Sequence, residues 1–318
     1  MMFHFEREQK VAEFGGVRFG GQPGENPPLL IGSMFQKGDK ILESRKSGKF
    51  DKAKATEYIK TMERLSGETG VPGMVAMVAN SAEEMKRYVD FYTSVTDMPF
   101  GIDIWVLKPR LESTEYVASL GLQDRLLYNS ITPWSEDPEG EVQTIQGLGV
   151  KNVLIQVFDD KDQMPSGRLT SLRALLPHVE GKGFDNLIVD TSVMNLPALS
   201  LSLWANRLVK EATGLPAGVA TANGTYMWKE AREQWGREGF VGIDAGAHAL
   251  SAALWSDFIF FGPMTGVERI FPAVATASAM LATLAFEETN ELPADKEHPL
   301  YRFFGEFAEK LGEGGTRK

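Results

Sequence analysis

The stretch Asn186-Leu187-Ile188-Val189-Asp190-Thr191-Ser192-Val193 runs through large apolar residues into a carboxylate. A short, continuous apolar run is typical of a strand buried on both faces, as in a parallel sheet. Runs of the same kind recur along the chain at Leu29–Phe35, Gly73–Ala79, Pro99–Val106, Arg125–Ile131, Asn152–Phe158, Pro216–Thr221 and Asp257–Gly262. The sequence therefore predicts eight strands.

Amphipathic segments fill the gaps between these runs. Asp51 is a suitable N-cap for a helix over 52–68, and Ser81 with Glu84 has the capping-box pattern before 82–96. Further helices are expected over 112–120, 138–147, 166–180, 196–213, 243–255 and 266–287, with an extra helical turn within 226–236. Eight alternating units predict parallel strands with right-handed crossovers, and eight strands close a barrel. We therefore predict a (β/α)₈ TIM barrel, with a doubly wound sheet as the alternative.

Both ends of the chain carry additions to this barrel, and we expect residues 1–318 to form one domain. Within residues 1–28, the run Phe14-Gly15-Gly16-Val17 predicts the turn of a hairpin, which should close the N-terminal end of the barrel. Residues 288–318 contain a further amphipathic helix over 299–311, followed by a polar end that we expect to be disordered.

Composition excludes several classes of site. The chain has no cysteine, which excludes disulfides, thiolate nucleophiles, iron–sulfur clusters and cysteine-ligated zinc. The four histidines have no metal-ligand spacing, so we expect no metal site. A net charge of −10 without a basic stripe argues against nucleic-acid binding. No apolar run reaches the length of a membrane span, and the N-terminus lacks a signal-peptide pattern, so we expect a cytoplasmic protein.

Polar residues follow the predicted strands at the end where barrel enzymes carry their active sites. They include Ser33, Asn80, Asp103, Asn129 with Ser130, Gln156, Asp190 and Asn223. Carboxylates and carboxamides, without a lysine base or a Ser–His pair, suit a flat ligand that offers several N–H donors and one carbonyl. A pterin presents such an edge, although a sugar or an amino acid could use the same groups.

Each of these residues also has a purely structural interpretation. Asp103 and Asp190 could cap a following helix, and Asn129 and Asn223 could close turns, as Asn-Gly pairs commonly do. We favour ligand binding because all four stand at predicted strand ends. Asp159 and Asp160 fit solvated loop charges better, and the histidines fit structural roles.

The chain also carries, in this order, the motifs Gly20-Gly21-Gln22-Pro23-Gly24-Glu25, Leu30-Ile31-Gly32-Ser33, Tyr128-Asn129-Ser130-Ile131, Ile188-Val189-Asp190-Thr191 and Phe271-Pro272-Ala273-Val274-Ala275. These motifs resemble the H subunit of tetrahydromethanopterin S-methyltransferase and its bacterial relatives. The resemblance covers most of residues 1–280. It implies a pterin-dependent methyltransferase on a barrel fold, usually a homodimer.

The resemblance also assigns roles to residues. It implies that Asp103, Asn129 with Ser130, and Asp190 hold the pterin ring and that Asn223 lies near N5. Asn223 and Asp190 are then the candidate catalytic residues, since an amide can both donate to N5 and accept from it and a carboxylate can relay a proton through water. Two departures leave the pterin type open: Ile104 and Trp105 follow Asp103 in place of small hydroxyl residues, and no histidine precedes Asn223.

The free-standing, acidic chain is most similar to the bacterial methylcorrinoid:tetrahydrofolate methyltransferases of glycine betaine demethylation. The expected reaction moves a methyl group between tetrahydrofolate and a corrinoid, a cobalamin-type cofactor carried by a partner corrinoid protein. The alternatives are a tetrahydromethanopterin-dependent methyltransferase subunit, another pterin-binding barrel enzyme, and a non-catalytic subunit that docks a corrinoid protein. An aldolase is disfavoured because no lysine or metal cluster stands at a strand end.

Overall fold

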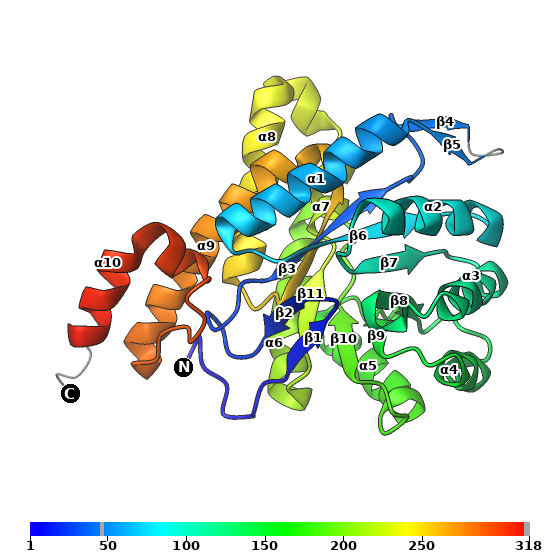
Figure 1. Ribbon diagram of the computed structural model, residues 1–318. Coiled ribbons are helices and arrows are strands. Elements are labelled where there is room, and N and C mark those ends of the chain that lie inside the picture. The colour runs from blue at the N-terminus through cyan, green and yellow to red at the C-terminus, as the bar shows by residue number, and fades with distance from the viewer. Residues whose placement is uncertain (45–47, 315–318) are drawn as a thin grey trace.

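Eight parallel strands close into a barrel in the computed structural model, which describes residues 1–44 and 48–314 (Figure 1). The strands are β3 (Leu29–Met34), β6 (Gly73–Val78), β7 (Phe100–Asp103), β8 (Leu126–Ile131), β9 (Asn152–Gln156), β10 (Asn186–Asp190), β11 (Ala217–Val219) and β12 (Phe258–Pro263). Their order around the barrel is β10-β11-β12-β3-β6-β7-β8-β9. Each one falls within a predicted run or one residue beyond it, so the predicted TIM barrel is confirmed and the doubly wound sheet is wrong.

Helices alternate with these strands and surround them (Figure 1). They are α1 (Lys52–Thr69), α2 (Ala82–Val95), α3 (Leu107–Ser119), α4 (Pro138–Gly147), α5 (Pro165–Val179), α6 (Leu196–Thr213), α8 (Glu230–Ala253) and α9 (Val267–Thr289). The predicted caps are present, because Asp51 accepts from the N–H of Lys54 and Ser81 from that of Glu84. Helix α3 begins five residues earlier than predicted. Pro109 lies in its first turn, where a proline removes no hydrogen bond, so the helix can include it.

A short helix, α7 (Thr221–Met227), follows β11 where the sequence suggested a loop. The turn interpretation of Asn223-Gly224 is therefore wrong. Gly224 serves close packing, because a Cβ atom there would lie 3.2 Å from the Cα of Leu196 at the start of α6. The extra helical turn expected within 226–236 corresponds to the end of α7 and the first part of α8, which kinks at Gly236.

The N-terminal hairpin closes one end of the barrel. Strands β1 (Val11–Phe14) and β2 (Val17–Gly20) pair with Phe14 opposite Val17. Gly15 and Gly16 have φ angles of 54° and 81°, which a two-residue hairpin turn needs and which glycine adopts without strain. Phe14 and Phe19 pack against inward-facing strand residues such as Ile31. A second small hairpin, which was not predicted, pairs β4 (Leu42–Ser44) with β5 (Lys49–Phe50).

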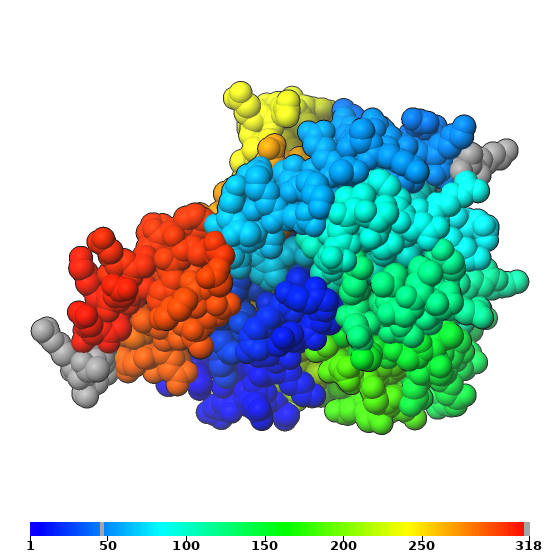
Figure 2. All heavy atoms as spheres, in the orientation of Figure 1, coloured from blue at the N-terminus to red at the C-terminus, as the bar shows by residue number. Residues whose placement is uncertain are grey.

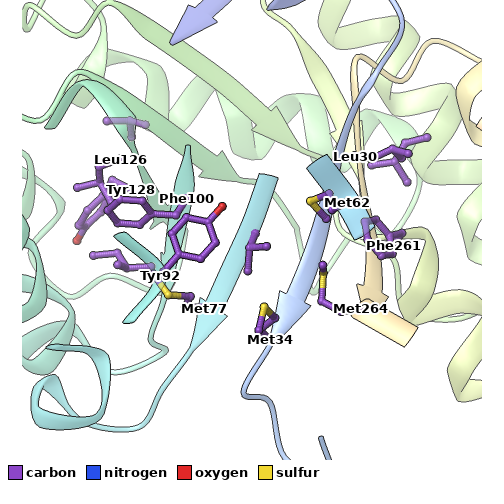
Figure 3. Packing of buried hydrophobic residues seen from close by; sticks show 14 of the residues in the cluster. Leu30, Met34, Met62, Met77, Tyr92, Phe100, Leu126, Tyr128, Phe261 and Met264 are labelled. Atoms are coloured by element: carbon purple, nitrogen blue, oxygen red, sulfur yellow. The ribbon is translucent and has the colours of Figure 1, made fainter. Parts of the chain in front are cut away.

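Alternating side chains along the strands divide the interior into two layers. Residues such as Leu30, Phe100 and Tyr128 point outward and pack beneath the helices. Figure 3 shows two groups of this outer layer, one around Tyr92, Phe100, Leu126 and Tyr128 and one around Met34, Met62, Phe261 and Met264. Leu127, Leu154 and Ile188 point into the barrel and pack on the hairpin. This inner layer forms a floor, and the next inward position on each strand lies above it.

At the C-terminus, α10 (Pro299–Gly314) packs on α9, and the pair projects away from the barrel (Figures 1 and 2). The last residues of the predicted disordered end, 315–318, lie outside the described residues. Short 3₁₀ helices cover Gln123–Arg125 and Met264–Gly266. The segment Met264–Thr289 is long and apolar enough to cross a membrane, but 61% of its most apolar window is buried against the rest of the fold.

Candidate functional site

The polar strand-end residues meet in one cavity of about 210 Å³ at the C-terminal end of the barrel. Its wall contains every residue that we expected to hold the pterin, together with side chains that the sequence did not single out. The lining consists of Ser33, Asp103, Ile104, Trp105, Arg110, Asn129, Ser130, Thr132, Gln156, Asp190, Ala220, Ala222, Asn223, Phe260 and Gly262. Asn80, Asp159 and Asp160 do not line it.

Strand register explains why these side chains converge. Asp103 on β7 pairs with Asn129 on β8, and Gln156 on β9 pairs with Asp190 on β10. Asn129, Gln156 and Asp190 each stand two residues beyond an inward-facing residue of the floor, so the period of two directs these side chains into the barrel. Asp103 is level with Asn129 on the neighbouring strand. Strands β7 to β11 are consecutive around the barrel, which places the acidic and amide groups on one side of the cavity.

The protein leaves most of these polar groups without partners of its own. Within the described chain, no group hydrogen-bonds the side chains of Asp103, Asn129, Gln156 or Asn223, although many other polar side chains are paired. Asp190 is 7% exposed and accepts one bond, from the backbone N–H of Ser192 at 2.9 Å. Enclosed polar groups are normally satisfied, so a set of free acceptors in a cavity points to a ligand that supplies the donors.

Both carboxyl groups have raised pKa values. Burial raises the pKa of Asp103 to about 6, against the opposing effect of the Arg110 guanidinium. Burial also raises the pKa of Asp190 to about 6, and the negative charge of Asp103 adds to it, while the Ser192 N–H and Arg168 oppose the rise. Two carboxylates that repel each other favour a ligand with several N–H donors, since such a ligand relieves the repulsion.

A buried arginine braces the loop that follows Asp103. Arg110, at the start of α3, donates from Nη1 to the carbonyl oxygens of Ile104 and Trp105 at 3.0 and 3.3 Å. Its Nη2 lies 2.6 Å from Glu141, and its Nε donates to the Tyr128 hydroxyl at 2.9 Å. This network fixes the backbone directly after the carboxylate and keeps a positive charge near it.

A second buried arginine braces the loop after Asp190 in the same way. Arg168 on α5 donates to the carbonyl oxygens of Thr191 at 2.6 Å and Ser192 at 3.2 Å. Ser192 has a φ of 48°, in the left-handed region that few non-glycine residues adopt. A strained residue beside a candidate ligand group is a common feature of functional sites.

Asn223 is positioned by the helix α7 that carries it. Two residues later, the Thr225 hydroxyl donates to Asp244 on α8 at 2.6 Å, and both side chains are buried. Arg269 on α9 completes the group, since its Nη2 lies 2.6 Å from Asp244 and 2.9 Å from the Tyr226 hydroxyl. These hydrogen bonds and this ion pair therefore join α7, α8 and α9 close to Asn223.

The sequence profile of the tetrahydromethanopterin S-methyltransferase MtrH subunit family matches residues 7–292. The chain belongs to this family. The H subunit of tetrahydromethanopterin S-methyltransferase from Methanothermobacter marburgensis is 30% identical over 312 residues, covering 95% of this chain and 99% of the relative. Its counterpart from Methanopyrus kandleri is 31% identical over 94% of this chain and 98% of its own length. The H subunit of tetrahydromethanopterin S-methyltransferase from Methanosarcina barkeri is 31% identical, with coverage of 94% and 99%.

The fold of this MtrH-family chain is shared with solved barrels. A dihydropteroate synthase of Yersinia pestis, in complex with a sulfonamide drug, superposes with a TM-score of 0.58 at 14% identity, covering 85% of this chain and 98% of that one. The Yersinia pestis enzyme with a pterine-sulfa conjugate gives a TM-score of 0.55 at 12% identity, with coverage of 86% and 98%. At this identity the likeness concerns the fold alone.

Several structural interpretations of the site residues are wrong in this family member. The N-cap of α3 is Val106 and that of α6 is Asn195, so neither Asp103 nor Asp190 caps a helix.

His248 and His298 are buried and bond to nearby backbone, as expected for structural histidines. Across residues 1–44 and 48–314, no three His, Asp or Glu side chains cluster closely enough to hold a metal ion.

Arg110, Arg168 and Thr132 are the functional candidates that sequence reasoning missed. A lone arginine in an amphipathic helix usually lies at the surface, and nothing in its neighbours marks it as buried. Only their place in the sequence could have marked these arginines as candidates. Arg110 and Arg168 both fall in the first two turns of a helix that follows a strand.

Proposed function

We propose that this protein is a methyltransferase that binds a tetrahydropterin in the barrel mouth and transfers a methyl group at its N5 atom. The observation that carries the proposal is the cavity in which two carboxylates, two asparagine amides and a glutamine converge, almost without protein partners. The aminopyrimidinone edge of a pterin offers N–H donors beside one carbonyl, which matches carboxylates flanked by amides. Membership of a methyltransferase-subunit family supports the reaction class.

The curated relatives favour a tetrahydromethanopterin-type substrate. They are named as tetrahydromethanopterin S-methyltransferase subunits, whereas no comparison supports the tetrahydrofolate and glycine betaine interpretation that the sequence suggested. We therefore take tetrahydromethanopterin as the leading substrate and tetrahydrofolate as the alternative. Both contain the same pterin ring and differ in the tail, so the polar groups described above serve either substrate.

We propose a corrinoid on a partner protein as the other methyl carrier. When bound, the corrinoid supplies the cobalt that accepts or donates the methyl group. The relatives are named as subunits, which supports an assembly. Exposed apolar side chains surround the mouth on neighbouring loops, including Trp105, Trp134, Met164 and Met194. An apolar rim around a site is typical of a protein-docking surface.

A cytoplasmic location stays a prediction.

Within the site, we assign positioning to the carboxylates and proton control to Asn223. Asp103, Asn129 with Ser130, and Asp190 orient the ring, which converts a two-body reaction into a directed one. N5 loses or gains a proton during transfer, and the Asn223 amide can serve both states because it donates and accepts. Asp190 or Asp103 can relay the proton through water.

We also propose that the protein is a homodimer that pairs through α9 and α10. Helix α9 has no charged residue between Ile270 and Phe286, yet Met280 on this stretch is 63% exposed. On α10, the rings of Phe303, Phe304 and Phe307 are each about half exposed. Three half-exposed rings leave roughly 300 Å² of apolar surface. A stable interface needs about 800 Å² per partner, so these helices supply a large share, and the uncharged stretch of α9 does not repel its own copy.

A methyl-transfer assay tests the function. The purified protein, dialysed against EDTA, is mixed with cob(I)alamin and either methyltetrahydromethanopterin or methyltetrahydrofolate. We expect methylcobalamin formation that is faster with the methanopterin substrate and needs no added metal. Binding of a pterin without any transfer, even with a corrinoid protein present, would favour the non-catalytic docking subunit. Equal or faster transfer from methyltetrahydrofolate would favour the folate alternative.

A further inference from the structure

A second cavity lies beside the helix that carries Asn223. Its volume is about 490 Å³, more than twice that of the mouth cavity. It lies between the start of α6, helix α7 and the start of α8, and it is lined by Asn195, Leu196, Pro197, Gly224, Met227, Trp228 and Glu230. The lining surface is mostly apolar, and Met227 is 60% exposed although it stands in a structured part of the chain. An open apolar hollow with one carboxylate at its rim suits an uncharged, flat group.

Helix geometry connects this cavity to the proposed reaction centre. Asn223 and Met227 are four residues apart in α7, so they share one face of the helix, with Met227 one turn further along. Gly224, directly after Asn223, belongs to the cavity wall and lies so close to Leu196 that a Cβ atom would crowd it. Asn223 lines the mouth and the next residue, Gly224, lines the apolar cavity, so the two spaces border adjacent residues of α7.

We propose that this cavity binds the aryl ring of the substrate's tail. The inference rests on the proposed function, in which Asn223 lies at N5 of the pterin. The tail of a tetrahydropterin is attached at C6, the ring atom next to N5, through one carbon and an arylamine nitrogen. A substituent that begins beside Asn223 passes next along Met227 and reaches Leu196, Pro197 and Trp228. Stacking and apolar contact with these side chains hold the aryl ring.

The charge of the cavity separates the aryl ring from the rest of the tail. Glu230 is the one charged residue in the lining. A carboxylate there disfavours the anionic end of the tail, which we place outside, towards solvent. The alternative occupant is an apolar side chain or ring from the docked partner. We favour the tail because the cavity wall begins at Gly224, next to Asn223, and the tail begins at C6, next to N5.

Paired ligands test the proposal. Affinities are measured by calorimetry for 6-methyltetrahydropterin, which has no tail, and for tetrahydropteroate, which has the aryl ring without glutamate. The wild-type protein should bind tetrahydropteroate at least about tenfold more tightly than 6-methyltetrahydropterin. Met227→Ala and Trp228→Ala should reduce this preference severalfold and leave the affinity for 6-methyltetrahydropterin unchanged. Trp204→Ala, which removes a half-exposed tryptophan from the outer face of α6, is the matched control and should keep the preference.

The outcomes separate this inference from the proposed function. If the wild-type protein binds neither ligand, the proposed function itself fails. If it binds both equally, or if the two variants weaken both ligands alike, the pterin site stands and the tail cavity is wrong. If the variants keep both affinities but slow transfer to a corrinoid protein, the cavity serves the partner, and the proposal is likewise overturned.

Discussion

Two carboxyl groups with pKa values near 6 share one pocket, and this makes ligand binding depend on pH. Ring N–H donors need the carboxylate form of Asp103 and Asp190, so a bound pterin lowers both pKa values. Protonation competes with binding below pH 6. The affinity should therefore rise as pH increases from about 5 to 7, by up to about tenfold per unit for each carboxyl, and level off above pH 7.

Asp190→Asn is the control for this pH dependence. The variant removes one titrating group, so it should bind more weakly and with a shallower slope between pH 5 and 7. The free protein should show the opposite trend in stability. The raised pKa values stabilise the fold fully below the unfolded value near 3.8, and this contribution is lost as pH rises through about 6. An affinity that stays flat or falls with rising pH would contradict the role of the carboxylates.

Asn223 should affect turnover more than binding. In the proposed function, other residues hold the ring edge, whereas the charge changes at N5, where a preorganised hydrogen bond gains most in the transition state. Asn223→Ala should lower the single-turnover rate by roughly 10²-fold and weaken pterin affinity much less. Alanine favours a helix more than asparagine does, so the melting temperature should not fall. A normal rate in the folded variant would rule out the catalytic role.

Helix α7 depends on a contact that can be removed with little change of shape. Thr225→Val deletes the hydroxyl that donates to Asp244 but keeps the branched side chain. The loss of one buried bond should cost about 1–3 kcal/mol of stability. Because Asn223 shifts with the helix, the transfer rate per folded molecule should fall about tenfold, with pterin affinity nearly unchanged.

Thr225→Ser is the matched variant for this test, since it retains the donor to Asp244. It should keep most of the wild-type rate. Single-turnover kinetics and calorimetry on both variants distinguish a positioning role from a purely structural one. Equal rates in the valine and serine variants would show that the Thr225–Asp244 bond does not position Asn223.

The strands could be predicted closely because burial on both faces leaves an unbroken apolar run, as in Leu187-Ile188-Val189. The convergence of the candidate site residues of β7 to β10 in one cavity followed from the same pattern, since a barrel directs strand ends to one mouth. Helix α7 could not be predicted, because Asn223-Gly224 is locally typical of a turn and only packing on Leu196 explains the glycine. The bracing arginines were missed because burial of Arg168 depends on carbonyl partners from a distant loop.

Helices α9 and α10 project from the barrel (Figure 2) and carry exposed apolar side chains, including Met280 and Phe307. If two copies pair there, a single charge at the centre should separate them, since a buried unpaired carboxylate is costly. Met280→Glu should convert a dimer into a folded monomer in sedimentation experiments. Lys182→Glu, which changes charge at an exposed site after α5 and outside both helices, is the control and should remain dimeric. A wild-type protein that sediments as a monomer at tens of micromolar would contradict the proposed dimer.

The barrel as a whole brings Asp103 and Asp190 together from positions 87 residues apart, and the central claim is that they jointly hold a pterin. The most direct measurement is calorimetric titration of tetrahydromethanopterin and tetrahydrofolate into the wild-type protein, Asp103→Ala and Asp190→Ala at pH 7.5. Loss of one carboxylate leaves ring donors unpaired, at a cost of about 1–3 kcal/mol. We predict wild-type binding that weakens roughly 5- to 150-fold in each variant while the fold survives. Wild-type affinity in a folded Asp190→Ala variant would contradict the account.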